Sequence, residues 1–187
     1  MNNPFKTVDI KSIEFDLAIV PESVIAHIWS VDLSDSSVKP GQTVDVSVVV
    51  ESWLSRKRSY RYKLRIPENL PPGSYELIIS GAENYQKFLR KAAPYRFTAD
   101  DLPSLIDAVN NIVNIRRDNL YFVLALPPGG LTIQKALLPD LPLSKALVLT
   151  DVKRTLETMP YQHWIEDKLH TGSVVIDKKS VQITVEK

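Results

Sequence analysis

The sequence predicts a mainly β protein in which an antiparallel sandwich is followed by a smaller α+β unit with one main helix. Three observations favour this fold class. Apolar and polar residues alternate with a period of two in several short runs, proline and glycine separate these runs, and one later segment repeats apolar residues at helical spacing. The 187 residues, of which 44% are hydrophobic and 24% charged, suffice to bury a core.

Five runs in the first half carry the strand pattern. In the first run, Ile13, Phe15, Leu17 and Ile19 are apolar and acidic residues lie between them, as in a half-buried strand. Similar alternation occupies 25–33, 43–50, 60–66 and 75–79, and turn-forming segments at 34–41 and 67–73 separate these runs. Short strands at this spacing are typical of an immunoglobulin-like sandwich.

A change in composition after Gly81 predicts two units. Residues 82–93 are polar and lack the alternation, so we expect a connecting segment between a sandwich at 8–81 and an α+β accessory domain at 94–187. Asp101 can cap a helix that has Pro103 in its first turn. The predicted buried stripe of this helix comprises Leu102, Leu105, Ile106, Val109, Ile112 and Val113.

The rest of the second half predicts further strands. Residues 120–126 are apolar on both faces, as in a central strand, and 131–137 can form a return strand. An apolar run follows at 146–149. The chain then closes with a predicted hairpin of 173–176 and 181–185.

Composition limits the classes of function. The absence of cysteine removes disulfides, thiolate nucleophiles and cysteine-based metal sites. A formal net charge of +1 gives no long-range field for nucleic acid, so we expect no specific nucleic-acid partner. No apolar stretch reaches the roughly 20 residues of a membrane span. The N-terminus lacks a signal-peptide pattern, so any export signal is expected outside this chain.

Four potential metal ligands recur late in the chain. His163, Glu166, Asp167 and His170 have the spacing i, i+3, i+4 and i+7, which on a helix would bring them to one face. A metal-dependent hydrolase using His163, Glu166 and His170 is therefore one hypothesis. The alternative is an amphipathic turn that buries the apolar residues between them. We expect no bound metal or cofactor.

A basic run with interleaved aromatic residues covers 55–65. In a strand, Tyr60, Tyr62 and Leu64 would point to the core while the cations between them face solvent and discourage edge-to-edge aggregation. The competing interpretation is a polyanion-binding strand. Its candidate contacts are Trp53, Arg56, Lys57, Arg58, Arg61 and Lys63.

Catalytic motifs are missing from the sequence. It contains no Gly-x-Ser-x-Gly elbow, no phosphate-binding glycine-rich loop and no His-Glu-x-x-His. Its three histidines do not lie in a recognisable catalytic context. We therefore expect no catalytic residue in this chain.

Several segments carry a family resemblance. Residues 25–33, 38–44 and 66–75 resemble bacterial immunoglobulin-like modules. Residues 116–121, 138–144 and the closing 172–185 resemble the region downstream of the peptidase in bacterial envelope proteins that have a SpoIVB-type serine peptidase domain. The resemblance covers about 7–187. It implies a C-terminal accessory part, with the catalytic serine and histidine in an upstream domain that is absent here.

The function expected from this reasoning is a non-catalytic accessory or binding module of a larger, exported or envelope-associated bacterial protein. Its expected partners are other domains of the parent polypeptide, or an envelope protein or glycan. The metal-dependent hydrolase and the polyanion-binding module are the alternatives.

Overall fold

The computed structural model describes residues 5, 9, 11–19, 24–52, 56–133, 136–150 and 158–187. The chain is mainly β, as predicted. The helical segments are α1 (Ala82–Ala92), the 3-10 helix η1 (Pro94–Phe97), α2 (Leu102–Val113) and α3 (Leu143–Leu149). The strands are β1 (Ile25–Leu33), β2 (Ser37–Val38), β3 (Thr43–Ser52), β4 (Arg58–Arg65), β5 (Gly73–Ser80), β6 (Asn119–Ala125), β7 (Leu131–Ile133), β8 (Ala136–Leu138), β9 (Thr158–Pro160), β10 (Trp164–His170), β11 (Val174–Val175) and β12 (Lys178–Val185).

Two sheets pack face to face around the main core. The four-stranded sheet has the order β11-β1-β3-β4, and the five-stranded sheet has the order β10-β6-β5-β12-β2. Alternate residues of both sheets, such as Val46 on β3 and Leu77 on β5, form one buried apolar cluster. The period-two pattern arises because each of these strands turns one side to this cluster and the other away from it.

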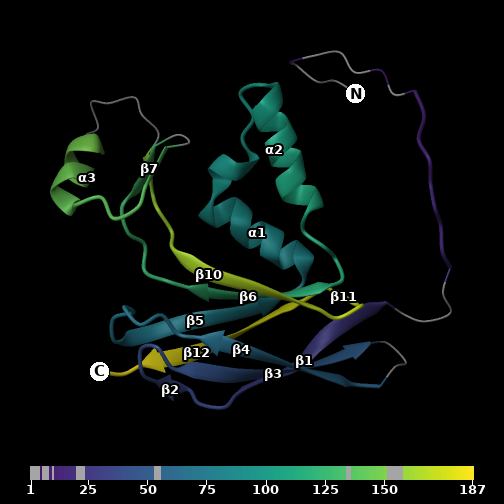
Figure 1. The fold of residues 1–187 in the computed structure, drawn as a ribbon, viewed down its shortest axis with the longest axis horizontal. Coiled ribbons are helices and arrows are strands. Elements are labelled where there is room, and N and C mark those ends of the chain that lie inside the picture. Colours follow the sequence, from purple (N-terminus) through teal and green to yellow (C-terminus); the bar gives the residue numbers. More distant parts are fainter. Residues whose placement is uncertain are drawn as a thin grey trace.

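Helices α1, η1 and α2 lie on the outer face of the five-stranded sheet, opposite the four-stranded sheet (Figure 1). A second apolar cluster fills the space between them, with Tyr85 and Leu89 of α1 against Tyr121 and Val123 of β6. A small sheet of the order β8-β7-β9 lies beside α3 at one end of the molecule. The five-stranded sheet is therefore covered on both faces, which explains why β6 is buried on both faces and is apolar or aromatic from Leu120 to Ala125.

The division at 82–93 needs correction. These residues form helix α1, and the five-stranded sheet combines β2 and β5 from the first predicted unit with β6, β10 and β12 from the second. The main apolar cluster likewise draws on both halves of the chain. Strands far apart in the sequence pair directly, for example β5 with β12, where Ser80 is the register partner of Lys178 and Gly73 that of Val185. The two halves thus contribute to one set of layers.

Most predicted strands are confirmed, but two predictions about pairing are wrong. The closing segments 173–176 and 181–185 do not pair with each other, because β11 pairs with β1 and β12 with β5 and β2. Residues 11–19 belong to none of the three sheets. Figure 1 shows this segment running outside the layers before the chain enters β1.

The predicted helix at 102–113 is confirmed, whereas its predicted burial is wrong. Asp101 caps α2 in a capping box: its carboxylate accepts from the Ser104 backbone N–H at 2.8 Å. Only Ala108 is buried on this helix. Packing uses a different side of α2 from the apolar stripe, which leaves four of its members exposed: Ile106, Val109, Ile112 and Val113.

Candidate functional site

The proposed metal ligands lie on a strand and not on a helix. Residues 164–170 form β10, which pairs antiparallel with β6 so that Glu166 is opposite Val123 and His170 opposite Asn119. Along a strand, seven residues span roughly 23 Å. His163 and His170 are consequently at opposite ends of β10, and the prediction of a shared helical face is wrong.

The two histidines also have different surroundings. The His163 ring contacts the Tyr161 ring edge-on, with 4.7 Å between centroids, and a Cβ added to Gly129 would lie 3.1 Å from its Nε2. His170 Nδ1 lies 3.4 Å from Asp118 Oδ2. Across the described residues, no group of three or more His, Asp or Glu side chains has metal-binding geometry. Glu166 is held by other partners, described below.

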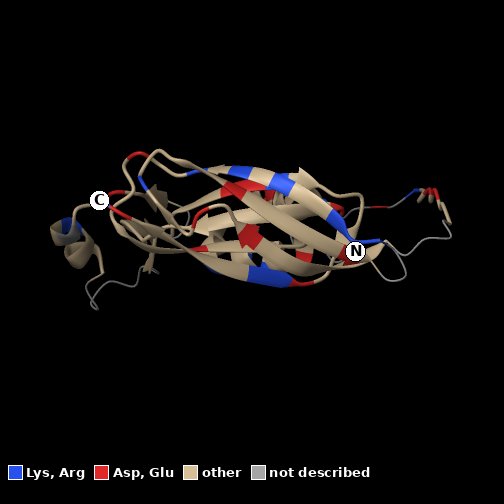
Figure 2. Ribbon diagram, turned by 90° about the horizontal axis from the view of Figure 1, so that it is seen from below, with Lys and Arg blue, Asp and Glu red and all other residues tan. Residues whose placement is uncertain are grey.

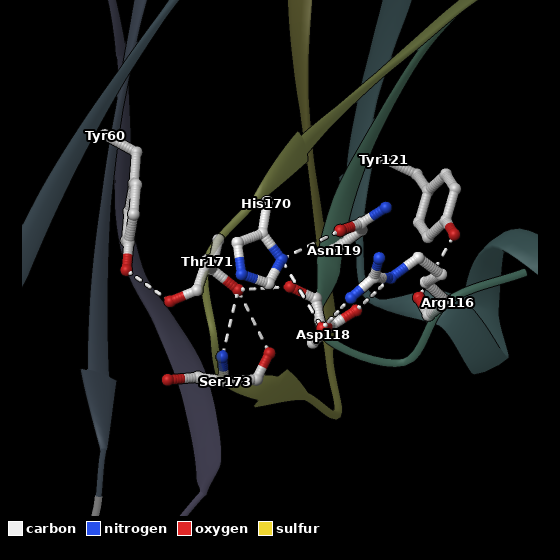
Figure 3. A network of polar contacts seen from close by, with 8 residues as sticks. All are labelled: Tyr60, Arg116, Asp118, Asn119, Tyr121, His170, Thr171 and Ser173. Carbon is white, nitrogen blue, oxygen red and sulfur yellow. Dashed lines mark hydrogen bonds and ion pairs between the residues drawn. The ribbon is translucent and has the colours of Figure 1, made fainter.

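His170 belongs to a polar network at one end of the sheets (Figure 3). Arg116 binds the Asp118 carboxylate through two hydrogen bonds, from Nε to Oδ1 at 3.0 Å and from Nη2 to Oδ2 at 2.7 Å. These bonds lower the pKa of Asp118 and raise the pKa of Arg116. The His170 ring, whose side chain is 63% exposed, lies between Asp118 and the Asn119 amide oxygen.

Buried Thr171 links three strands beside this network. Its hydroxyl lies 3.0 Å from the carbonyl oxygens of Asp118 and of Ser173, and its own carbonyl accepts from the Tyr60 hydroxyl of β4 at 2.9 Å. Ser173 is also buried and donates its backbone N–H to the Thr171 hydroxyl. The network therefore fastens the end of β10 to β6 and β4, which is a structural role.

A cavity of about 280 Å³ lies between the helices and the outer face of the five-stranded sheet. Its size is near the lower end of ligand pockets, which hold roughly 300–1,000 Å³. It therefore suits a small group better than a large cofactor. Its lining comprises Tyr85, Leu89, Arg96, Asn111, Asn114, Ile115, Tyr121, Glu166, Asp167 and Lys168.

Glu166 is the central acceptor of this cavity. Its Oε2 accepts from the Tyr85 hydroxyl of α1 at 2.7 Å and from the Trp164 indole N–H at 2.6 Å. Tyr85 stacks on Tyr121, with 4.1 Å between ring centroids and 5° between ring planes. Phe88 meets Trp164 edge-on at 5.7 Å. The strand period explains this arrangement, because 164 and 166 project to the same face of β10.

The tyrosines of the cavity are held in the neutral form. Burial, followed by the hydrogen bond to Glu166, raises the pKa of Tyr85. Burial also raises the pKa of Tyr121, whose hydroxyl donates to the Arg116 carbonyl at 3.1 Å. Near neutral pH both hydroxyls therefore act as hydrogen-bond donors.

Two cations complete the cavity. The Arg96 guanidinium of η1 lies 5.3 Å from the Trp164 ring centroid, and its carbonyl accepts from the Asn111 side chain at 3.2 Å. Lys168 of β10 is opposite Tyr121. Within the part of the chain that the structure describes, neither cation forms an ion pair. Both cations share the lining with two acidic residues, Glu166 and Asp167.

The basic run lies on β4, an outer strand of the four-stranded sheet. The predicted orientation is confirmed, because Tyr60 and Tyr62 pack on the main core while Arg61 and Lys63 are exposed. Acidic residues share this outer face, since Asp45 of β3 is the register partner of Lys63. Figure 2 shows basic segments with acidic segments beside them on this side of the molecule. The surface therefore has mixed charge.

The other candidate contacts are only partly described. Trp53 lies outside the described residues, whereas Arg56 and Arg58 are exposed. Lys57 Nζ lies 3.1 Å from the ring centroid of Trp29, which is 57% exposed. Trp29 is the additional residue where the register between β1 and β3 shifts. The sequence of the basic run gives no indication of this contact between Lys57 and Trp29.

Sequence reasoning missed Tyr85, because it interprets 82–93 as a connecting segment, and it missed Arg96, which lies just after that segment in η1. A usable signal was present: Ala82, Tyr85 and Leu89 are spaced i, i+3 and i+7, and all three are buried in α1. Their polar neighbours obscured this stripe.

No family model matches the chain, and no curated protein or solved structure matches it either. None of the described helices is long and apolar enough to cross a membrane.

Proposed function

We propose that this chain is a non-catalytic binding module of a larger, exported bacterial envelope protein, and that its cavity receives an acidic group from a neighbouring polypeptide. The observation that carries the proposal is the pairing within the cavity. Glu166 accepts from both Tyr85 and Trp164, while Arg96 and Lys168 have no ion-pair partner among the described residues. Tyr85, Trp164 and Glu166 therefore satisfy one another, and Arg96 and Lys168 can bind a ligand.

The two cations, which lack an ion-pair partner among the described residues, favour a carboxylate as that group, bound on the side of the cavity away from Glu166 and Asp167. Arginine and lysine both bind carboxylates, and a partly enclosed site strengthens the attraction relative to bulk water. The small volume suits one acidic side chain or a chain terminus better than a glycan. A segment of another domain or of an envelope protein would supply it.

The same arrangement favours binding over catalysis. A general base needs a lone pair that is free to take a proton near neutral pH. Glu166 Oε2 already accepts two hydrogen bonds, and the Tyr85 hydroxyl stays protonated because its pKa is raised. These groups order the site without offering a proton-transfer pair.

The architecture and the parent protein are further parts of the proposal. We infer that the two packed sheets are an immunoglobulin-like sandwich with a helical layer added to one face. Their largely antiparallel pairing around a shared core supports this inference.

The resemblance to regions downstream of SpoIVB-type peptidases supports an upstream catalytic domain and export. The reading frame preceding Met1 tests that part: it should encode a signal sequence and a peptidase domain.

Binding can be tested by NMR titration of the full chain with a short peptide rich in glutamate. We expect shift changes at Arg96, Lys168 and Asn111, and their loss in the double variant Arg96→Gln/Lys168→Gln. The matched control is Arg61→Gln/Lys63→Gln, which removes two cations from the opposite side of the molecule and should bind normally. Shifts that disappear only in the control variant would favour the polyanion-binding alternative. Peptidase or esterase turnover abolished by replacing one Ser or His would refute the non-catalytic role.

A further inference from the structure

The N-terminal segment has an unpartnered strand pattern. Residues 11–19 lie outside the sheets, and the side chains at its alternate apolar positions are strongly exposed: Ile13 by 63%, Phe15 by 87%, Leu17 by 82% and Ile19 by 89%. Isolated exposed apolar residues are ordinary, but four in strict alternation are not explained by this arrangement. The segment has the side-chain pattern of a half-buried strand without a sheet to join.

The sheets end on one side with an incomplete edge. β4 is the outer strand of its sheet, and β10 is the outer strand of the facing sheet. Tyr62 of β4 stacks on Phe122 of β6 at 4.3 Å, so β4 lies above β6 and its sheet stops before covering β10. A further strand beside β4 would therefore lie above β10.

Four apolar or aromatic side chains along this edge are only half-buried, while Leu64 of β4 is buried and Asp167 of β10 is exposed. The four pack on the main cluster but keep part of their surface exposed: Tyr60 and Tyr62 on β4, and Ile165 and Leu169 on β10. The outward N–H and C=O groups of β4 have no strand partner among the described residues. An added strand with apolar residues at alternate positions would cover these side chains and pair these backbone groups.

We propose that residues 11–19 of a second copy of this chain add as a strand to the β4 edge. Charge complementarity supports this occupant. Glu14 and Asp16 are two residues apart, as are Arg61 and Lys63 on the exposed side of β4. Pairing the two acids with the two cations places Phe15 beside Tyr62, whichever direction the added strand takes.

The charges also select against the wrong partner. Two β4 edges brought together would place Arg61 and Lys63 against like charges, which disfavours direct edge-to-edge pairing. An acidic strand meets attraction at the same positions. Figure 1 shows 11–19 lying apart from β4 of its own copy. Exchange between copies gives a closed dimer when it is reciprocal and a head-to-tail chain when it is not.

Light scattering of the full chain at increasing concentration tests the association. We expect assembly at high concentration, with hydrogen exchange at the β4 amides slowed in the assembled form. Phe15→Asp should raise the dissociation constant by about ten- to hundredfold, the factor expected from losing a buried phenylalanine. This position is exposed in the single copy, so the variant should keep the parent's melting temperature at concentrations where the parent is monomeric.

Two further variants make the test specific. Glu14→Lys/Asp16→Lys should weaken assembly, and adding Arg61→Glu/Lys63→Glu in the same chain should restore it. Ile106→Asp is the matched control, because it places the same acid on a different exposed apolar site, the α2 stripe. A chain that stays monomeric at all concentrations would overturn the proposal. This holds if its β4 amides exchange freely, and also if residues 11–19 of the same copy protect them. Assembly that is lost with Ile106→Asp but kept with Phe15→Asp would overturn it as well.

Discussion

The hydrogen bond between Tyr85 and Glu166 should stabilise the attachment of α1 to the five-stranded sheet. Tyr85→Phe removes one hydroxyl and keeps the ring that stacks on Tyr121 at 4.1 Å. A hydrogen bond to a charged group contributes about 1.5–3 kcal/mol. Glu166 is exposed and retains its bond from Trp164, so we expect a loss near the lower limit, about 1–2 kcal/mol.

Urea unfolding followed by circular dichroism measures this loss. With a slope of about 2 kcal/mol per molar urea, the midpoint should fall by roughly 0.5–1 M. Tyr95→Phe is the matched control, because it deletes a tyrosine hydroxyl from the adjoining η1 that has no hydrogen-bond partner among the described residues. The control should stay within about 0.5 kcal/mol of the parent. Equal midpoints for the two variants would refute the stabilising role of the Tyr85–Glu166 bond.

Three other predictions concern stability. Burial, and then Asp167, raises the pKa of Tyr62 to about 12, and burial raises that of Tyr85; the unfolded chain loses these protons near pH 10. Stability is therefore complete below about pH 10 and falls as pH rises further, which urea titrations at pH 9 and 11 would reveal. Gly81→Ala should destabilise by about 3 kcal/mol or more in the same assay, since its Cβ would lie 1.7 Å from the Val175 carbonyl oxygen. Thr171→Val should cost about 1–3 kcal/mol, because a buried carbonyl loses its hydroxyl partner.

Controls separate these effects from general damage. Gly172 has a φ of +69° and open space around its Cβ, so Gly172→Ala should cost only about 1 kcal/mol from backbone strain. A Gly81 variant no less stable than the Gly172 variant would contradict the close approach to β11. In the pH series, Tyr85→Phe should lessen the alkaline loss without abolishing it, because Tyr62 still contributes. An unchanged alkaline loss would contradict a raised pKa for Tyr85.

The sequence alone predicts those helices and strands that depend on interactions between residues close together in the chain. Four strands could be predicted from the sequence: β1, β3, β4 and β5. Each turns one face toward the core, so apolar and polar residues alternate within a few positions. The start of α2 was predictable because Asp101 and Ser104 satisfy backbone N–H groups of their own helix turn. The orientation of Tyr60 and Tyr62 followed from the same period.

Tertiary structure decided which elements become neighbours. The spacing of residues 163–170 is compatible with a helix or a strand, and pairing with β6 selected the strand and separated the two histidines. The apolar stripe of α2 and the alternation at 13–19 show which side of a segment is apolar, but not what covers it. The candidate cavity joins Tyr85, Arg96 and Glu166 from three elements. Periodicity describes one segment at a time, whereas a site between segments depends on contacts formed only when distant parts of the chain pack together.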